Sequence, residues 1–208
     1  MTDSRVWDAL ERWRSVAFLA GSVSFVAIAI NDAFIAMANT GVNLTPLVHL
    51  GLMLLVYAGL LGLTSRLVER VPRLGRVCQV LPLVFGLEIV LTFVAFAAGF
   101  LPGVIPRFVF ALIVLTSMIG AALTPTVFGA ATLWSDAYSR AVGGFLLLAA
   151  VALSIAIVNT ILFGDIGGPE WVSVVANGTF GLSLGAVGVL LRTEAGPSEQ
   201  AESTETVA

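Results

Sequence analysis

The sequence predicts an all-α fold, a polytopic membrane protein in which six helices form one bundle. Two observations support this prediction. Of the 208 residues, 58% are hydrophobic and 11% are charged, and the mean hydropathy is +1.02, whereas an ordinary soluble domain has about 25% charged residues. Six stretches are also long and apolar enough to cross a bilayer, which takes about 20 residues in a helix.

Short connections rich in Gly, Pro, Asn and charged residues separate the predicted spans. Because the connections are short, neighbouring helices are expected to run antiparallel. No stretch has the composition of a separate soluble domain, so residues 1–192 are expected to form one membrane domain. The predicted spans cover residues 15–37, 46–64, 80–101, 108–133, 141–163 and 172–191.

The two ends of the chain have different compositions. Residues 4–14 place apolar side chains on one helical face, which predicts an interfacial helix with Trp7 and Trp13 at the level of the lipid headgroups. Residues 193–208 are acidic and lack an apolar periodicity, which predicts a disordered tail.

An alternative for the first span is a cleaved signal peptide. Ala36, Met37 and Ala38 match the small-x-small pattern of a cleavage site, and cleavage would remove residues 1–38 and leave five spans. The apolar stretch is long for a signal peptide, and Asp32 lies just before the site. Both features favour a retained first helix.

The positions of the basic residues predict the orientation. All ten are Arg, and nine of them lie in the N-terminal segment, the second and fourth connections and the start of the tail, whereas Arg107 lies on the opposite side. Positive residues accumulate on the cytoplasmic side, so we expect a plasma-membrane protein with both termini inside. An Arg-only composition rich in Ala, Val and Gly is typical of high-GC genomes, including those of salt-adapted archaea.

The connection over residues 65–79 is basic and amphipathic, with arginines at helical spacing and apolar residues between them. Arginines near a membrane surface attract anionic lipid headgroups, so we expect this segment to contact them on the cytoplasmic side. The alternative is a docking surface for a partner subunit, such as an ATPase. The arginines are Arg66, Arg70, Arg73 and Arg76.

Polar residues within the spans give the main functional signal. A charged side chain at the centre of a membrane helix costs ~2.5–3.5 kcal/mol on insertion scales, so such residues face one another or a hydrated cavity. Several lie at a similar depth on different spans, which predicts an outward-facing polar pocket with Glu88 at its floor, protonated or paired with a cation. The alternative is hydrogen bonding that only holds the bundle together. The candidate residues are Glu88, Asp32, Asn31, Asn159, Asn177, Thr116 and Ser117.

Small residues predict where helices pack closely. The last span has glycines along one face, which let two backbones approach. We expect this face to pack inside the bundle, and a homodimer contact is the alternative. The glycines are Gly178, Gly181, Gly185 and Gly188.

Other functions are excluded by what the sequence lacks. One Cys and one His permit neither a disulfide nor a Cys/His zinc site within the chain, and we expect no metal, cofactor or catalytic residue because no hydrolase or nucleotide-binding motif occurs. A net charge of −3 gives no basic surface for nucleic acid. We therefore expect binding or translocation of a small solute or cation, as the membrane subunit of a larger transporter, with a noncatalytic scaffold or sensor subunit as the alternative.

Overall fold

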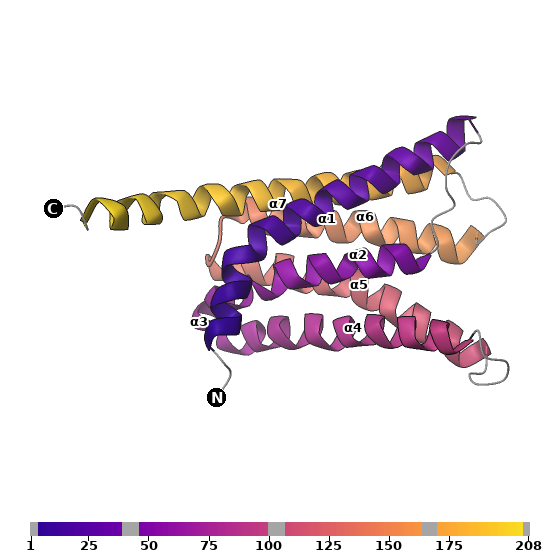
Figure 1. Cartoon of the computed structure of the whole chain (residues 1–208), viewed down its shortest axis with the longest axis horizontal. Helices are drawn as coiled ribbons and strands as arrows, with labels where there is room; N and C mark the ends of the chain where they lie inside the picture. Colours follow the sequence, from indigo (N-terminus) through magenta and orange to yellow (C-terminus); the bar gives the residue numbers. More distant parts are fainter. Residues whose placement is uncertain (1–3, 39–45, 100–106, 164–169, 206–208) are drawn as a thin grey trace.

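The computed structural model describes residues 4–38, 46–99, 107–163 and 170–205 (Figure 1). Within these ranges the chain is helical apart from short breaks and has no strand, which confirms the all-α fold. The helices are α1 (Ser4–Ala38), α2 (Pro46–Leu61), α3 (Thr64–Arg70), α4 (Pro72–Gly99), α5 (Arg107–Ser135), α6 (Arg140–Phe163) and α7 (Glu170–Glu205).

The long helices are arranged as a closed ring. α1 packs against α2, α2 against α4, α4 against α5, α5 against α6 and α6 against α7, and α7 returns to α1. Fully buried apolar side chains fill the interior. They include Phe18 from α1, Leu60 from α2, Phe128 from α5, Leu146 from α6 and Phe180 from α7.

The outside of the ring is apolar as well. Val23 on α1, Leu87 on α4 and Leu182 on α7 are all exposed, and helices that are hydrophobic all round belong in a membrane. Five helices of the described residues are long and apolar enough to span one, and α2 with α3 would form a sixth, broken span. The predicted membrane bundle is therefore confirmed as a fold class.

The pair α2 and α3 is bent by 44° at Gly62 and Leu63. A Cβ at Gly62 would lie 2.5 Å from the Leu10 carbonyl oxygen, so glycine allows α1 to cross closely at the break. The carbonyl of Leu63, the N-cap residue of α3, accepts a hydrogen bond from Tyr138 Oη at 3.2 Å. The second predicted span, 46–64, is therefore not one straight helix.

The basic connection is helical, because α3 and the start of α4 occupy it. α4 begins at Pro72, eight residues before the predicted limit at 80. Proline suits a first helical turn because its missing N–H would have no partner there. As a result, Glu88 lies 16 residues from the start of α4 and 11 residues from its end at Gly99.

The two terminal helices are longer than the spans expected for them. α1 is one continuous helix, and its first turns cross the bundle before the helix turns along it (Figure 1). α7 continues to Glu205, into residues that their composition predicted to be disordered. Extending an existing helix requires no new nucleus, which explains how an acidic segment without apolar periodicity joins α7.

Candidate intramembrane site

Glu88 on α4 contacts hydroxyl groups of α5. Thr116 Oγ1 donates a hydrogen bond to Glu88 Oε1. One turn along α4, Thr92 Oγ1 donates to the Glu88 backbone carbonyl at 2.9 Å and lies 3.1 Å from Ser117 Oγ. Thr92 and Ser117 are fully buried and Glu88 is half-buried, so this hydroxyl cluster lies between the two helices.

The hydroxyl of Thr116 has more than one acceptor. Besides Glu88, it lies 3.0 Å from the carbonyl oxygens of both Leu112 and Ile113. A hydroxyl has one proton and two lone pairs, so Thr116 donates to an ionised Glu88 or, with its proton turned to a carbonyl, accepts from a protonated one. The arrangement therefore accommodates both charge states of the acid.

Tyr57 on α2 lies next to the contact between α4 and α5 that contains Glu88. Its side chain is 2% exposed, and a Cβ at Gly86 would lie 3.6 Å from its ring, which places the ring against α4. The hydroxyl oxygen is buried and forms no hydrogen bond within the usual limits of distance and angle among the described residues, but the Thr124 hydroxyl is close enough to bond with it and the Glu88 carboxylate lies nearby. Thr124 already donates to the Gly120 carbonyl at 2.7 Å, so its oxygen can accept a hydrogen bond from Tyr57.

The second acid of the bundle lies between α1 and α7. Asn177 Nδ2 donates a hydrogen bond to Asp32 Oδ2 at 2.9 Å, and Asn177 is buried. Both residues belong to the candidate set. The pair differs from the Glu88 cluster because an amide, not a hydroxyl, contacts the carboxylate.

The glycines of α7 lie along the same contact with α1. A Cβ at Gly181 would be 2.9 Å from the Val26 backbone nitrogen, and one at Gly188 would be 2.8 Å from Leu19 Cγ. A Cβ at Gly185 would be 2.7 Å from a serine hydroxyl, whereas one at Gly178 would meet its nearest neighbour at an ordinary 3.7 Å. The α1–α7 seam, defined as Asp32, Asn177 and these glycines, is thus a close backbone contact.

The hydrogen bonds divide the predicted pocket residues into two groups. Glu88, Thr116 and Ser117 lie at the α4–α5 contact, and α2 packs between α4 and α1, which bears Asp32 (Figure 1). Asn31 and Asn159 are half-buried on α1 and α6, and the hydrogen bonds described above do not include them. The α2–α4–α5 junction, defined as Tyr57, Glu88, Thr92, Thr116, Ser117 and Thr124, is therefore the candidate site.

A third polar cluster lies at the end of the bundle where α1 begins. Arg14 is 5% exposed and forms a 2.8 Å ion pair with Glu11. The guanidinium carbons of Arg14 and Arg66 lie 5.6 and 5.5 Å from the ring centre of Tyr138. Burial raises the pKa of Tyr138 to about 12, and the two arginines oppose that rise.

Sequence reasoning missed this cluster. Glu11 and Arg14 are three residues apart, the spacing of a helical ion pair, and that is the one local signal. Their contacts with residues 54 and more positions away depend on how α1 folds back across α3, which no local pattern reveals.

The remaining candidate residues are at the surface. Arg70, Arg73 and Arg76 are exposed on α3 and the start of α4. In the part of the chain that the structure describes, no three His, Cys, Asp or Glu side chains lie close enough together to hold a metal ion. The oxygen ligands that the α2–α4–α5 junction could offer a cation are one carboxylate and several hydroxyls.

Comparison of the chain with protein-family models, with curated proteins and with solved structures found no match in any of the three.

Proposed function

We propose that the bundle binds a proton or a small cation at Glu88 and that the α2–α4–α5 junction is part of a route for a small solute or cation across the membrane. One observation carries the proposal. A carboxylate on a membrane helix is held by the Thr116 hydroxyl and lies near a buried tyrosine hydroxyl, that of Tyr57.

The charge of Glu88 supports a bound cation or proton. Among the described residues, the ion pairs join Glu11 to Arg14 and Arg66, and none includes Glu88. An unpaired carboxylate is expensive inside a membrane, so binding of a proton or cation lowers the free energy of the site.

The chemistry of the neighbours is consistent with either ligand. Thr116 exchanges the roles of donor and acceptor as Glu88 changes charge, because its hydroxyl also reaches two carbonyl oxygens. Hard cations prefer oxygen ligands, and the junction offers the Glu88 carboxylate with the Tyr57 hydroxyl nearby. No enzymatic role is proposed, since no nucleophile and base are paired here.

The proposal includes an orientation with both termini in the cytoplasm. The beginning of α1, the end of α7, α3 and the start of α4 lie at one end of the bundle (Figure 1), which gathers most arginines there. Arg192 is exposed. In a Cys78→Ser background, Arg192→Cys should react with an impermeant maleimide in inside-out vesicles. Reaction in intact cells would contradict the orientation.

Ion flux into proteoliposomes tests the function. Purified protein is reconstituted with a trapped dye that responds to protons, to Na⁺ or to K⁺, and a potential is imposed in buffers of Na⁺, K⁺ or impermeant choline. Wild type should admit protons or one of the cations, and Glu88→Gln should abolish this flux while it keeps the side-chain shape. Asp32→Asn is the matched control and should retain the flux. Equal flux in wild type and Glu88→Gln, or none in wild type, would favour the scaffold alternative.

A further inference from the structure

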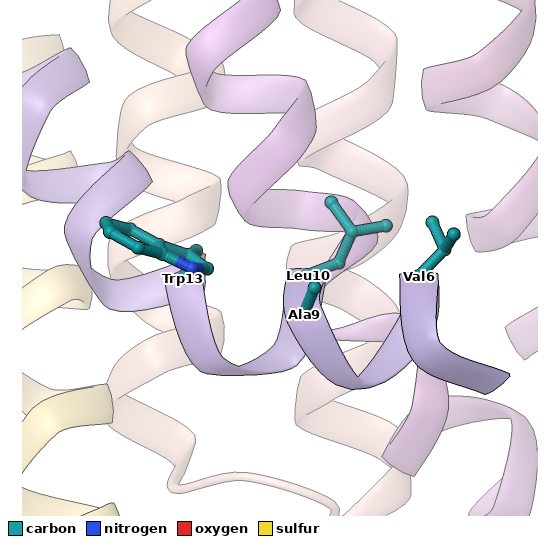
Figure 2. A pocket seen from close by; sticks show the side chains of 4 residues that line it. All are labelled: Val6, Ala9, Leu10 and Trp13. Atoms are coloured by element: carbon teal, nitrogen blue, oxygen red, sulfur yellow. The ribbon is translucent and has the colours of Figure 1, made fainter.

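We propose that the first turns of α1 form a binding site for the acyl chain of an anionic phospholipid. Val6, Ala9, Leu10 and Trp13 line a hollow of about 410 Å³. Figure 2 shows these side chains on a segment that lies crosswise to the helices behind it. Val6 is 55% exposed and Trp13 is 65% exposed, so the hollow is open to the surroundings of the bundle.

Polar contacts on other faces of the segment fix its direction. Glu11 accepts a hydrogen bond from Ser65 at 3.2 Å and lies 3.5 Å from Arg66, both on α3. Buried Arg14 pairs with the same carboxylate. The backbone of Leu10 rests against Gly62. The segment is thereby tied to the bundle, while Val6 and Trp13 stay exposed and Ala9 and Leu10 are half-buried between them.

Continuity with the membrane-facing side of α1 identifies the occupant as lipid. Trp13 is followed at helical spacing by Val16, Val23, Ile30 and Phe34, all of which are exposed. This stripe runs along a helix long and apolar enough to span the membrane, so acyl chains cover it. The hollow lies at one end of the stripe, where the same chains would meet the headgroup region.

Charge near the hollow favours an anionic headgroup. Arg12 is exposed next to Trp13, and Arg70 and Arg73 are exposed at the end of α3 and the start of α4. No carboxylate of the described residues forms an ion pair with any of these three arginines. They lie at the same end of the bundle as the crosswise segment (Figure 1), where a phosphate group would be attracted to them.

Quenching of Trp13 by brominated lipid tests this site. Trp7, Trp134 and Trp171 are replaced by Phe, and the protein is placed in nanodiscs with bromine on the acyl chains of either phosphatidylglycerol or phosphatidylcholine. At equal mole fractions, brominated phosphatidylglycerol should quench more, with a local enrichment of about fivefold, the factor expected for one arginine at an anionic surface. Arg12→Gln with Arg70→Gln and Arg73→Gln should keep the quenching but remove the preference.

A second measurement uses the native tryptophans in case the triple Phe variant fails to fold. Wild-type protein in mild detergent should retain phosphatidylglycerol over phosphatidylcholine in native mass spectra, and Ala9→Trp, which fills the hollow, should reduce that retention. Absence of Trp13 quenching, equal quenching by both lipids, or retention unchanged by Ala9→Trp would overturn the proposal. A copurifying peptide that shields Trp13 from all lipids would overturn it in favour of a protein partner.

Discussion

The α1–α7 seam and the α2–α4–α5 junction each place one carboxylate inside the bundle, but they surround it with different groups. Asp32 contacts the amide of Asn177, which can only donate through the nitrogen it presents. Glu88 contacts the hydroxyl of Thr116, which donates or accepts. The seam therefore suits one fixed hydrogen bond, whereas the junction tolerates a change of charge.

Close packing is common to the two regions. Three glycines of the seam face α1 so closely that a Cβ would collide with it, and a Cβ at Gly120, between Ser117 and Thr124 on α5, would collide with the Phe85 ring on α4. The two regions differ in their polar groups, because the junction buries the Tyr57 hydroxyl close to Thr124 and Glu88. The two acids therefore have different neighbours: Asp32 accepts a hydrogen bond that joins α1 to α7, and Glu88, beside hydroxyl groups, is the residue proposed to bind a ligand.

The largest effect is expected in the seam. Gly181→Leu would force a side chain against the Val26 backbone nitrogen, 2.9 Å from the Cβ position, and overpacking against backbone should cost about 3 kcal/mol or more. Expression, gel filtration and thermal melting should show loss of the folded protein. Gly178→Ala is the matched control, because its Cβ has 3.7 Å of space. Normal folding of Gly181→Leu would show that α1 and α7 are not packed this closely.

The next largest effect is expected at Tyr138, in the polar cluster at the end of the bundle where α1 begins. The folded-state pKa of Tyr138 is about 12, above the unfolded value of about 10, so its stabilisation is complete below pH 10 and is lost as the pH rises to 12. The loss should be about 2–3 kcal/mol, seen as a falling Tm in alkaline melts.

The chain has no Lys and two Tyr, and the free Cys78, whose thiol also titrates at alkaline pH, is replaced by Ser for this measurement. Tyr138→Phe should weaken the alkaline dependence of the Tm, and it should also remove the hydrogen bond to the Leu63 carbonyl. An unchanged alkaline dependence in Tyr138→Phe would assign it to other groups.

A smaller effect is expected at Tyr57. Tyr57→Phe removes a buried hydroxyl next to Thr124, so it should change stability by no more than about 1 kcal/mol, and it should slow the flux that depends on Glu88. Melting and proteoliposome flux measure the two effects separately. A clear loss of stability would mean that the hydroxyl has a structural partner and that the junction resembles the seam.

The smallest effect is expected for Asp32→Asn. Asparagine keeps one oxygen that accepts the hydrogen bond from Asn177, and an NH₂ group replaces the other oxygen. Stability should therefore change by no more than about 1 kcal/mol, and the flux should be unaffected. The melt and the flux of this variant are compared with those of wild type. Abolished flux with normal folding would assign the ligand to Asp32 and reverse the comparison.

Long apolar runs made the helical membrane fold predictable from the sequence. The positions of Glu88 and Asp32 within those runs placed both acids inside the membrane. Depth along a helix does not give the direction around the ring, so the sequence grouped both acids in one pocket although α2 packs between α1 and α4. The bend at Gly62 could not be predicted either, because the apolar residues on both sides of it have the composition of one continuous span. It depends on the crossing of α1, which is distant in the sequence.

The most direct test of the central claim is infrared difference spectroscopy of Glu88 in the reconstituted protein. Between low and high pH, or on addition of the cation that the flux assay identifies, wild type should show a change in the carbonyl band of a protonated carboxylic acid. Glu88→Gln should remove that band, and Asp32→Asn should leave it. A carboxylic acid band that responds equally in wild type and in Glu88→Gln would contradict the assignment of Glu88 as the ligand-binding group.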